Sequence, residues 1–379
     1  MPPARAAPRR SGSGPLPRAD AGELLPELPG VLTGHQVRTT VAWIAGQQDA
    51  DGALPWFRGG QLDPWDSVEA AMALDIGGEH ARAADAYRWL ARRQRHDGSW
   101  AAEYRDGAES APAAESNHAG YLAVGSWHTW LRSGDEALVA DLWPAVRRGL
   151  DLVVRMQLSG GAVSWALRPD GTPDDTALLT GNASLFQALR CGIALAALHG
   201  ESQPDWELAV TDLGAALRTR PGDFADRSRY SMDWYYPVLG GALTGTAARE
   251  RLAADWDRFV VPGLGARCVA DRPWVTGAET CELALALAAA GQPDAAIEQV
   301  AAMQHLRHDD GSYWTGLVYA DDARWPVERT TWTAAAVVLA ADALAGASPA
   351  AALFTDPAAL PAPGLAATPA ADAADTVLP

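Results

Sequence analysis

One short phrase recurs along this chain and constrains its fold more than any other feature. It is clearest as Gln-Arg-His-Asp-Gly-Ser-Trp at residues 94–100, and looser copies occupy residues 47–56, 156–165 and 303–316. In each copy a helical pattern ends, an Asp-Gly or Gly-Gly pair predicts a tight turn, and an aromatic residue follows. A helix-ending phrase that returns every several dozen residues is typical of a helical repeat protein.

The segments between the copies predict two alternating kinds of helix. One kind carries many Arg, Asp and Glu residues and is expected at residues 34–48, 79–94, 135–157, 205–219, 246–260 and 294–305. The other is expected at residues 63–76, 116–131, 182–198, from 231 onward, 276–290 and 329–344. Helices of this second kind are apolar on nearly every side, so they must be buried on most sides. Six such pairs predict an all-α (α/α)6 toroid, with six inner helices inside six outer ones. An open solenoid is the alternative, but its repeats would be more uniform in length.

Composition indicates the expected domain boundaries and argues against some classes of binding partner. Residues 1–30 and 347–379 are rich in Ala and Pro without periodicity, so we expect disordered tails around a barrel domain at residues 31–346. A net charge of −17 argues against nucleic acid as a partner. No apolar run is long enough for a membrane helix. Three cysteines without a C-x-x-C arrangement favour reduced thiols and a cytoplasmic location.

Two stretches resemble known families of (α/α)6 toroids. Residues 94–100 have the form Gln-x-x-Asp-Gly-x-Trp, which resembles the repeats of prenyltransferases and squalene/terpene cyclases. Residues 133–150, leading to Met156-Gln157, resemble six-hairpin glycosidases such as the glucoamylase type. The chain also resembles actinobacterial proteins labelled "prenyltransferase". This resemblance covers about residues 30–345 and implies the toroid fold, with either a sugar or an isoprenoid conjugate as a small-molecule substrate.

The residues that isoprenoid chemistry requires are missing from the sequence. The chain has neither an Asp-x-Asp-Asp string, which cyclases use as an acid, nor an Asp-Asp-x-x-Asp string for prenyl diphosphates. Protein prenyltransferases, which have a similar fold, hold zinc with Asp, Cys and His. Glu279-Thr280-Cys281 faintly resembles that pattern, but residues 329–344 contain no histidine. We therefore expect no metal and no cofactor.

Acids and aromatic residues at the starts of the inner helices favour a sugar substrate. Glycosidases need two carboxyl groups, and flat aromatic rings suit a pyranose. The candidate catalytic residues are Glu69, Asp233, Glu279 and Glu328. The candidate substrate-binding residues are Asp63, Trp65, Asn117, Trp234, Tyr235, Tyr236, Trp274, Trp314 and Tyr319. Glu69 and Glu279 lie in or near apolar helices, where a carboxylate without a partner is costly. The glucoamylase resemblance implies Glu328 or Asp322 as base and Asp174 or Asp175 as acid.

Structural interpretations compete with several of these assignments. Asp63 and Asp233 also suit helix N-caps or first-turn acids. Asp51, Asp97 and Asp310 belong to the turn phrase and are expected to be structural. The leading hypothesis is a carbohydrate-active enzyme with acid/base chemistry at the barrel mouth. The alternatives are a prenyltransferase- or terpene-cyclase-like enzyme and a non-catalytic sugar- or lipid-binding protein.

Overall fold

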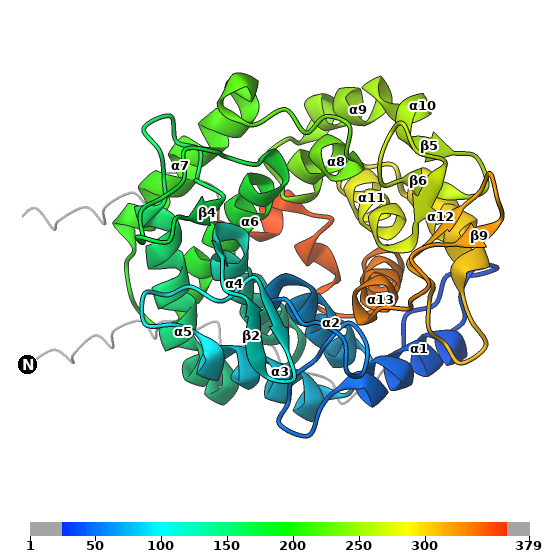
Figure 1. Ribbon diagram of the computed structural model, residues 1–379, viewed down its shortest axis with the longest axis horizontal. Helices are drawn as coiled ribbons and strands as arrows, with labels where there is room; N and C mark the ends of the chain where they lie inside the picture. Colours follow the sequence, from blue (N-terminus) through cyan, green and yellow to red (C-terminus); the bar gives the residue numbers. More distant parts are fainter. Residues whose placement is uncertain (1–24, 362–379) are drawn as a thin grey trace, which may run out of the picture.

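The computed structural model describes residues 25–361, which form a closed double ring of helices (Figure 1). The inner helices are α2 (Pro64–Ile76), α4 (Ser116–Ser133), α6 (Leu179–Leu198), α8 (Ser231–Leu239), α11 (Gly277–Ala289) and α13 (Thr331–Ala345). The outer helices are α1 (Gly34–Gln47), α3 (His80–Arg93), α5 (Glu136–Arg155), α7 (Pro204–Thr219), α9 (Gly245–Ala254), α10 (Trp256–Phe259) and α12 (Pro293–Ala302). Each inner helix packs against the next, and α13 packs against α2. The predicted (α/α)6 toroid is confirmed. The expected fifth outer helix is interrupted at Asp255 and becomes α9 and α10.

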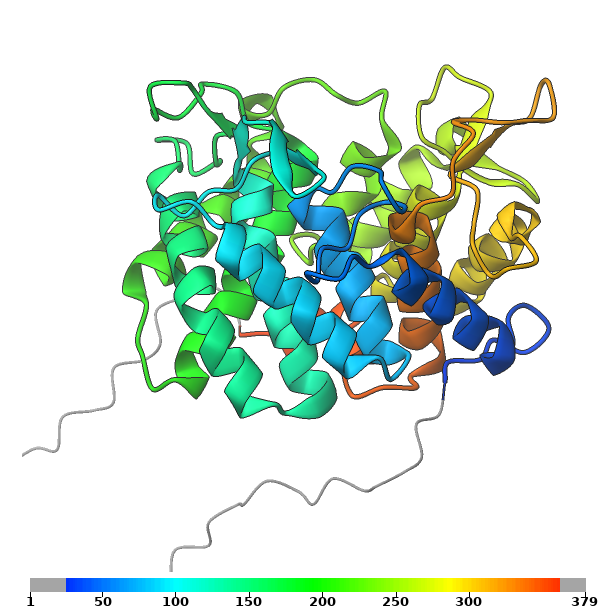
Figure 2. The same cartoon turned by 60° about the horizontal axis from the view of Figure 1, so that its bottom comes forward.

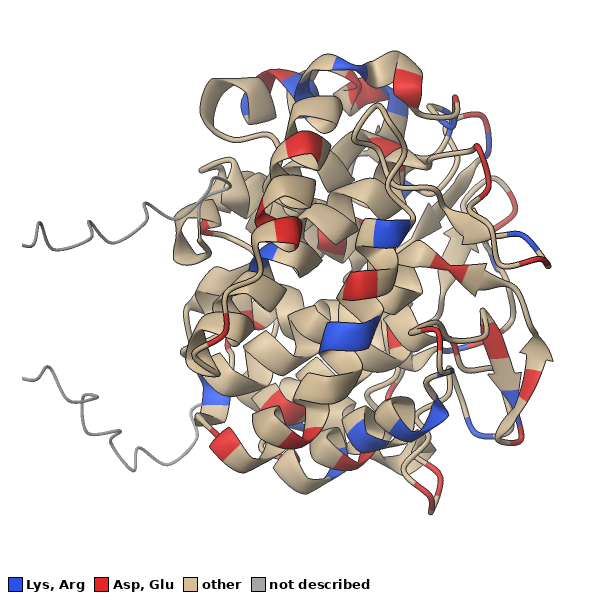
Figure 3. Cartoon of the chain, turned by 90° about the vertical axis from the view of Figure 1, so that its left-hand side faces the viewer, with Lys and Arg blue, Asp and Glu red and all other residues tan. Residues whose placement is uncertain are grey.

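The inner helices are buried because most of their residues are apolar or small. Every residue of α2 is buried, including its three acids Asp66, Glu69 and Asp75. The outer helices bury one face only, and Figure 3 shows Arg, Asp and Glu spread over them and over the loops at one end of the ring. The distribution of charged residues along the sequence therefore distinguishes the outer helices from the inner ones.

Each copy of the recurring phrase joins the outer helix that it follows to the next outer helix. Gly98 has φ +95°, and a Cβ atom there would lie 2.2 Å from the carbonyl oxygen of Arg148 in α5. Only glycine allows both this conformation and this approach. Gln94 of the same copy donates a hydrogen bond from Nε2 to the Ala145 carbonyl of α5, at 2.9 Å. The phrase is thus a connector between neighbouring outer helices.

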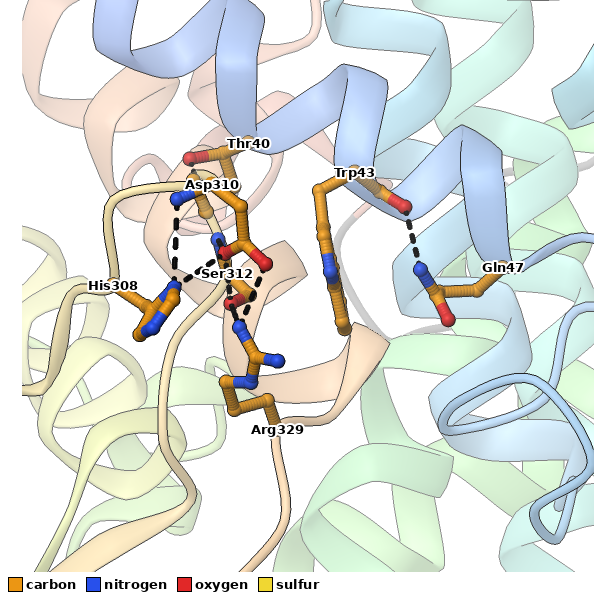
Figure 4. A network of polar contacts seen from close by, with 8 residues as sticks. Thr40, Trp43, Gln47, His308, Asp310, Ser312 and Arg329 are labelled. Carbon is orange, nitrogen blue, oxygen red and sulfur yellow. Dashed lines mark hydrogen bonds and ion pairs between the residues drawn. The ribbon is translucent and has the colours of Figure 1, made fainter.

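The last copy of the phrase closes the ring onto the first helix (Figure 4). The Gly311 carbonyl accepts a hydrogen bond from Thr40 Oγ1 of α1 at 2.8 Å. The Asp310 carboxylate accepts hydrogen bonds from the Ser312 backbone N–H at 3.1 Å and from Arg329 Nη1 at 2.7 Å. Burial alone would raise the pKa of Asp310, but these hydrogen bonds outweigh it and lower the pKa. The structural interpretation of Asp310 is confirmed.

Short strands occupy the loops that lead from outer to inner helices. Two pairs are β1 (Glu103–Arg105) with β2 (Ala108–Ala111), and β3 (Ala114–Glu115) with β4 (Ala166–Leu167). A five-stranded antiparallel sheet contains, in order, β5 (Val260–Val261), β6 (Gly265–Arg267), β7 (Trp274–Thr276), β8 (Gly316–Val318) and β9 (Ala323–Arg324). Figure 2 shows these strands together at one end of the barrel. This end, where the inner helices begin, is called the mouth below, and the opposite end is called the closed end.

A C-terminal segment covers the closed end, which corrects the expected domain boundary at residue 346. Residues 347–361 include two 3-10 turns, η3 (Ala351–Leu353) and η4 (Pro357–Ala359). Arg190 of α6 donates hydrogen bonds to the carbonyl oxygens of Leu360 and Pro361, both at 2.8 Å. A few apolar side chains, such as the buried Phe354, are enough to fix a segment whose composition predicts a tail. Residues 1–24 and 362–379 of the expected tails lie outside the described residues. Within residues 25–361, no helix has the length and apolar character needed to cross a membrane.

Candidate active site

Four acids enter the barrel from two inner helices in matching positions. Asp66 and Glu279 are the third residues of α2 and α11, and Glu69 and Glu282 are the sixth residues of the same helices. Three residues of α-helix rise about 4.5 Å, so the acids form two levels. We call Asp66 and Glu279 the upper layer, nearer the mouth, and Glu69 and Glu282 the lower layer. Their exposed fractions are 9%, 4%, 3% and 2%, respectively.

Aromatic contacts across the ring show that this cluster lies in the barrel lumen. The ring order α2–α4–α6–α8 places α2 and α8 opposite each other. Trp65 of α2 nevertheless contacts Tyr236 of α8, with ring centroids 5.5 Å apart in an edge-to-face arrangement. Trp65 also lies 5.1 Å from the ring of Tyr121 on α4. These contacts span the lumen and form an aromatic floor, which consists of Trp65, Tyr121, Tyr235 and Tyr236.

Glu69 has one satisfied and one unsatisfied carboxyl oxygen. Its Oε1 accepts hydrogen bonds from Trp65 Nε1 and from the Tyr121 hydroxyl, both at 2.9 Å. Its Oε2 is buried without a hydrogen-bond partner. Burial raises the pKa of Glu69 to about 7, although these hydrogen bonds and the nearby N–H of Trp332 act in the opposite direction. A buried acceptor without a partner in a lumen is suited to a ligand hydroxyl.

Glu282 is the other acid of the lower layer, and both of its carboxyl oxygens accept hydrogen bonds from tyrosines. One of its oxygens accepts a short hydrogen bond from the Tyr235 hydroxyl, and the other accepts one from the Tyr236 hydroxyl at 3.0 Å. Burial raises the pKa of Glu282 well above its ordinary value, and the negative charge of Glu69 adds to the effect. Burial thus favours the protonated form of Glu282.

Asp66 lies beside Asp63, which caps its helix. Asp63 accepts hydrogen bonds from the Asp66 backbone N–H and from Trp56 Nε1, both at 2.9 Å. Burial raises the pKa of Asp66 well above its ordinary value, and the negative charges of Asp63 and Glu69 raise it further. Burial and the neighbouring acids thus favour the protonated form of Asp66. The N-cap interpretation of Asp63 is confirmed.

Glu279 lies in the first turn of α11, where the helix dipole favours a negative charge. Its neighbour is Cys268, from the loop between β6 and β7. Burial raises the pKa of the Cys268 thiol, and the carboxylate of Glu279 raises it further. Glu279 therefore faces an uncharged thiol. The described part of the chain contains no group of three or more His, Cys, Asp or Glu residues arranged to hold a metal ion.

The structure places Asp233 outside this cluster. Its carboxylate accepts hydrogen bonds from the Thr180 hydroxyl at 2.6 Å and from the Thr180 backbone N–H at 3.3 Å, and so holds the start of α6. It lines a pocket of about 330 Å³ with Arg251 and Asp255. Burial raises the pKa of Asp233. Its neighbour Trp234 points toward the outer ring, where it stacks on Phe259 at 5.2 Å.

The other predicted residues lie around the rim of the mouth. Glu328 is half-buried in the loop before α13, and burial raises its pKa. Trp314 lies under the Arg329 guanidinium, and the Tyr319 hydroxyl accepts a hydrogen bond from Arg267 at 3.0 Å. The remaining candidates are Trp274 in β7, Asn117 at the second position of α4, Asp174 and Asp175 in the loop after β4, and the exposed Asp322. The structure thus brings together Glu69 and Glu279 of the four catalytic candidates.

The sequence-based candidates omit Asp66, Glu282 and Tyr121. A signal for the two acids was present, because Asp63, Asp66 and Glu69 are spaced by three residues, as are Glu279 and Glu282. This spacing places acids on one helix face, and in an apolar helix that face must lead to a shared site. Tyr121 is a single tyrosine in an inner helix, and nothing in its local sequence marks it.

Comparison with known proteins identifies the family. No protein-family model matches the chain. A curated relative from Mycolicibacterium hassiacum, named "MMP endo-(1,4)-3-O-methyl-alpha-D-mannosidase", is 53% identical over 332 residues, which cover 88% of this chain and 92% of the relative.

Solved structures of more distant proteins share the fold. A wild-type glycosidase superposes with a TM-score of 0.64 at 16% identity, over 83% of this chain and 97% of the other. A GH63 mannosylglycerate hydrolase from Thermus thermophilus has a TM-score of 0.59 at 14% identity, over 80% and 99% of the two chains. None of these three proteins is a prenyltransferase or a cyclase, so the resemblance to those enzymes is not confirmed. The chain belongs to the family of the Mycolicibacterium hassiacum mannosidase and is a carbohydrate-active enzyme of the six-hairpin glycosidase type.

Proposed function

We propose that this enzyme hydrolyses internal α-1,4 bonds in a polysaccharide of 3-O-methylmannose, the substrate that the name of its relative states. The observation that supports this proposal most is the upper layer, in which Asp66 and Glu279 enter the lumen at the same helical level. Glycoside hydrolysis needs one carboxyl group that donates a proton and another that acts on the anomeric carbon. The aromatic floor beneath them would support one sugar ring.

Asp66 is the proton donor in this proposal. Burial and the charges of Asp63 and Glu69 raise its pKa, which favours the protonated state that a general acid requires. Its proton passes to the glycosidic oxygen as the bond from that oxygen to the anomeric carbon breaks. The resulting carboxylate regains a proton from solvent at the mouth.

Glu279 is the partner carboxylate. Glu282 is unsuited to the role because both of its oxygens accept tyrosine hydroxyls and its pKa is raised. Glu279 either accepts the proton of a water that adds to the anomeric carbon, or bonds to that carbon until water releases it. The first course inverts the anomeric configuration and the second retains it.

Glu69 orients the substrate. Its free Oε2 would accept a hydrogen bond from a sugar hydroxyl above the floor. Trp65, which binds Oε1 of the same carboxyl group, would contact the apolar face of the ring. No observation favours the isoprenoid alternative. The cytoplasmic location stays a prediction, which cell fractionation would check.

The test is endo-hydrolysis of α-1,4-linked 3-O-methylmannose oligosaccharides, with product lengths and anomers measured by chromatography and NMR. Asp66→Asn and Glu279→Gln should each lower turnover by about 10²–10⁴-fold. Glu328→Gln and Asp233→Asn are matched acid-to-amide controls, and both should stay within tenfold of wild type. Activity retained by both upper-layer variants, with unchanged melting temperatures, would rule out these roles. A wild-type enzyme that leaves the oligosaccharides intact would rule out the substrate.

A further inference from the structure

A hollow on the face of the mouth differs in chemistry from the acidic lumen. It measures about 390 Å³ and is lined by Arg229, Val269, Arg272, Pro273, Trp274, Val318 and Trp325. We call it the rim cleft. Its walls come from β7, β8, the loop between β6 and β7, and the loops before α8 and α13. Five of its seven lining side chains are apolar or aromatic.

Most of the rim cleft is lined by apolar side chains, and two of its polar groups, the ring N–H of Trp274 and the guanidinium of Arg229, are already hydrogen-bonded. The rings of Trp274 and Trp325 meet edge-to-face, with centroids 4.8 Å apart at 82°. The ring N–H of Trp274 donates a hydrogen bond to the Trp325 carbonyl at 2.8 Å. Arg229 binds both carboxylate oxygens of Asp271, at 2.9 and 3.2 Å. Trp325 is still 54% exposed, which is unusual for so large an apolar side chain and indicates a binding surface.

The rim cleft is continuous along the chain with the acidic site. Trp274 begins β7, which leads directly into α11, and Glu279 follows five residues later. Five residues span at most about 17 Å, so the cleft lies within a few sugar units of the upper layer. The Trp325 loop leads in the same way into α13, whose Trp332 lies beside Glu69. A polymer held at the upper layer would therefore extend over this surface.

We propose that the rim cleft is a distal subsite for O-methylated mannose units of the polysaccharide, to one side of the bond that is cleaved. This inference rests on the proposed function. A methoxy group is apolar and carries no hydrogen-bond donor, so it packs against Trp and Val at little cost. A free hydroxyl in the same place would lose its water partner without replacement, which is unfavourable. The rim cleft thus selects methylated over unmethylated chains and holds the polymer for internal cleavage.

Trp325→Ala is the test variant, because its side chain is exposed and its loss leaves the core intact. Leu208→Ala is the matched control, since Leu208 is 57% exposed on the outer helix α7. The substrates are long and short 3-O-methylmannose oligosaccharides and an unmethylated α-1,4-mannan oligosaccharide of the longer length. Binding is followed by calorimetry and hydrolysis by kcat/KM.

Trp325→Ala should lower affinity and kcat/KM for the long methylated substrate by about tenfold and leave those for the other two substrates unchanged. Leu208→Ala should change neither. An equal effect on methylated and unmethylated chains, or no effect, would overturn the proposal. So would a wild-type dimer that Trp325→Ala dissociates, because a second copy would then occupy the cleft. Binding of the long methylated substrate without cleavage, still weakened by Trp325→Ala, would refute the proposed hydrolysis but support the subsite.

Discussion

Buried acids have different neighbours and hydrogen-bond partners at the two ends of the six inner helices. At the mouth, Asp66 and Glu69 lie among other acids, and the hydrogen bonds of Glu69 come from uncharged tryptophan and tyrosine. At the closed end, Asp75 accepts a hydrogen bond from Thr129 Oγ1 at 3.1 Å and lies 3.8 Å from His128 Nδ1. Asp342 there accepts one from Ser348 Oγ at 2.6 Å, within the segment that covers the barrel. The acids at the closed end thus contact His, Thr and Ser side chains, whereas those at the mouth also face one another.

This difference is expected if the acids at the mouth carry out the proposed chemistry at a cost in stability. Buried acids that repel one another cost free energy of folding, and such clusters persist in active sites because catalysis needs them. The two ends should therefore respond to pH in opposite ways. Burial raises the pKa of Glu69 to about 7 at the mouth, and it lowers the pKa of His128 to about 4 at the closed end, where Asp75 opposes the shift.

The largest expected effect comes from uncovering the closed end. A chain that ends at residue 346 loses the buried side chains of Leu353, Phe354 and Leu360 and leaves Arg190 without its carbonyl partners. The free energy of unfolding should fall by about 5 kcal/mol or more, measured by urea denaturation. A chain that ends at residue 361 is the control and should match the full chain. Equal midpoints for both truncations would show that the segment only rests on the barrel.

Glu69→Gln should stabilise the protein at alkaline pH. In the folded state the pKa of Glu69 is raised to about 7, so the native protein holds a proton that the unfolded chain releases near 4.5. Wild-type stability should therefore fall as pH rises from about 4.5 to 7, by about 3 kcal/mol from this group. The amide removes that loss and still accepts the two hydrogen bonds through its oxygen. Unfolding free energies at pH 5 and pH 8 check this, and an unchanged difference between them would contradict it.

His128 should make the closed end sensitive to acid. Its folded pKa of about 4 lies below the ordinary value of 6.5, so the unfolded chain binds the proton first as pH falls. The stability from this group is complete above pH 6.5 and is lost toward pH 4, by up to about 3 kcal/mol. His128→Gln should flatten this part of the stability–pH curve, whatever its effect at neutral pH. A stability–pH curve of His128→Gln with the wild-type slope would show that other groups cause the acid sensitivity.

The smallest effect is expected at the turn that follows the outer helix α12. Asp310→Ala removes the hydrogen bonds from Ser312 and the ion pair with Arg329, but the carboxylate is 43% exposed. Solvent screens such pairs, so the loss should be about 1 kcal/mol with unchanged activity. Thermal unfolding checks the first part and the hydrolysis assay the second. A drop in turnover at unchanged melting temperature would give this turn a role in the site.

The sequence predicts those features of the fold that depend on local residue patterns. The phrase at residues 94–100 and the contrast between charged and apolar helices are sufficient for the toroid. Helix α6 begins at Leu179, three residues before the expected start, because Asp233 from another helix holds its first turn. The pairing of β7 with β8 joins two different hairpins, so no local signal predicts the sheet.

The sequence predicts only part of the candidate site, because local patterns mark some of its residues and not others. Glu69 and Glu279 stand out as acids within apolar helices. The roles of Tyr121 and Glu282 depend on contacts across the lumen, which only the closed ring creates. Asp233 and Glu328 carry the same local signal of an acid near an inner-helix start, yet they face a neighbouring helix and the rim.

The most direct measurement compares turnover and stability in one variant, Asp66→Asn, at pH 8. If the mouth gives up stability for chemistry, kcat/KM on the methylated oligosaccharide should fall by about 10²–10⁴-fold. The melting temperature should equal or exceed that of wild type, because the amide removes a buried carboxyl group from a cluster of like charges. Turnover within tenfold of wild type, or a loss of turnover that only follows a lower melting temperature, would contradict this assignment.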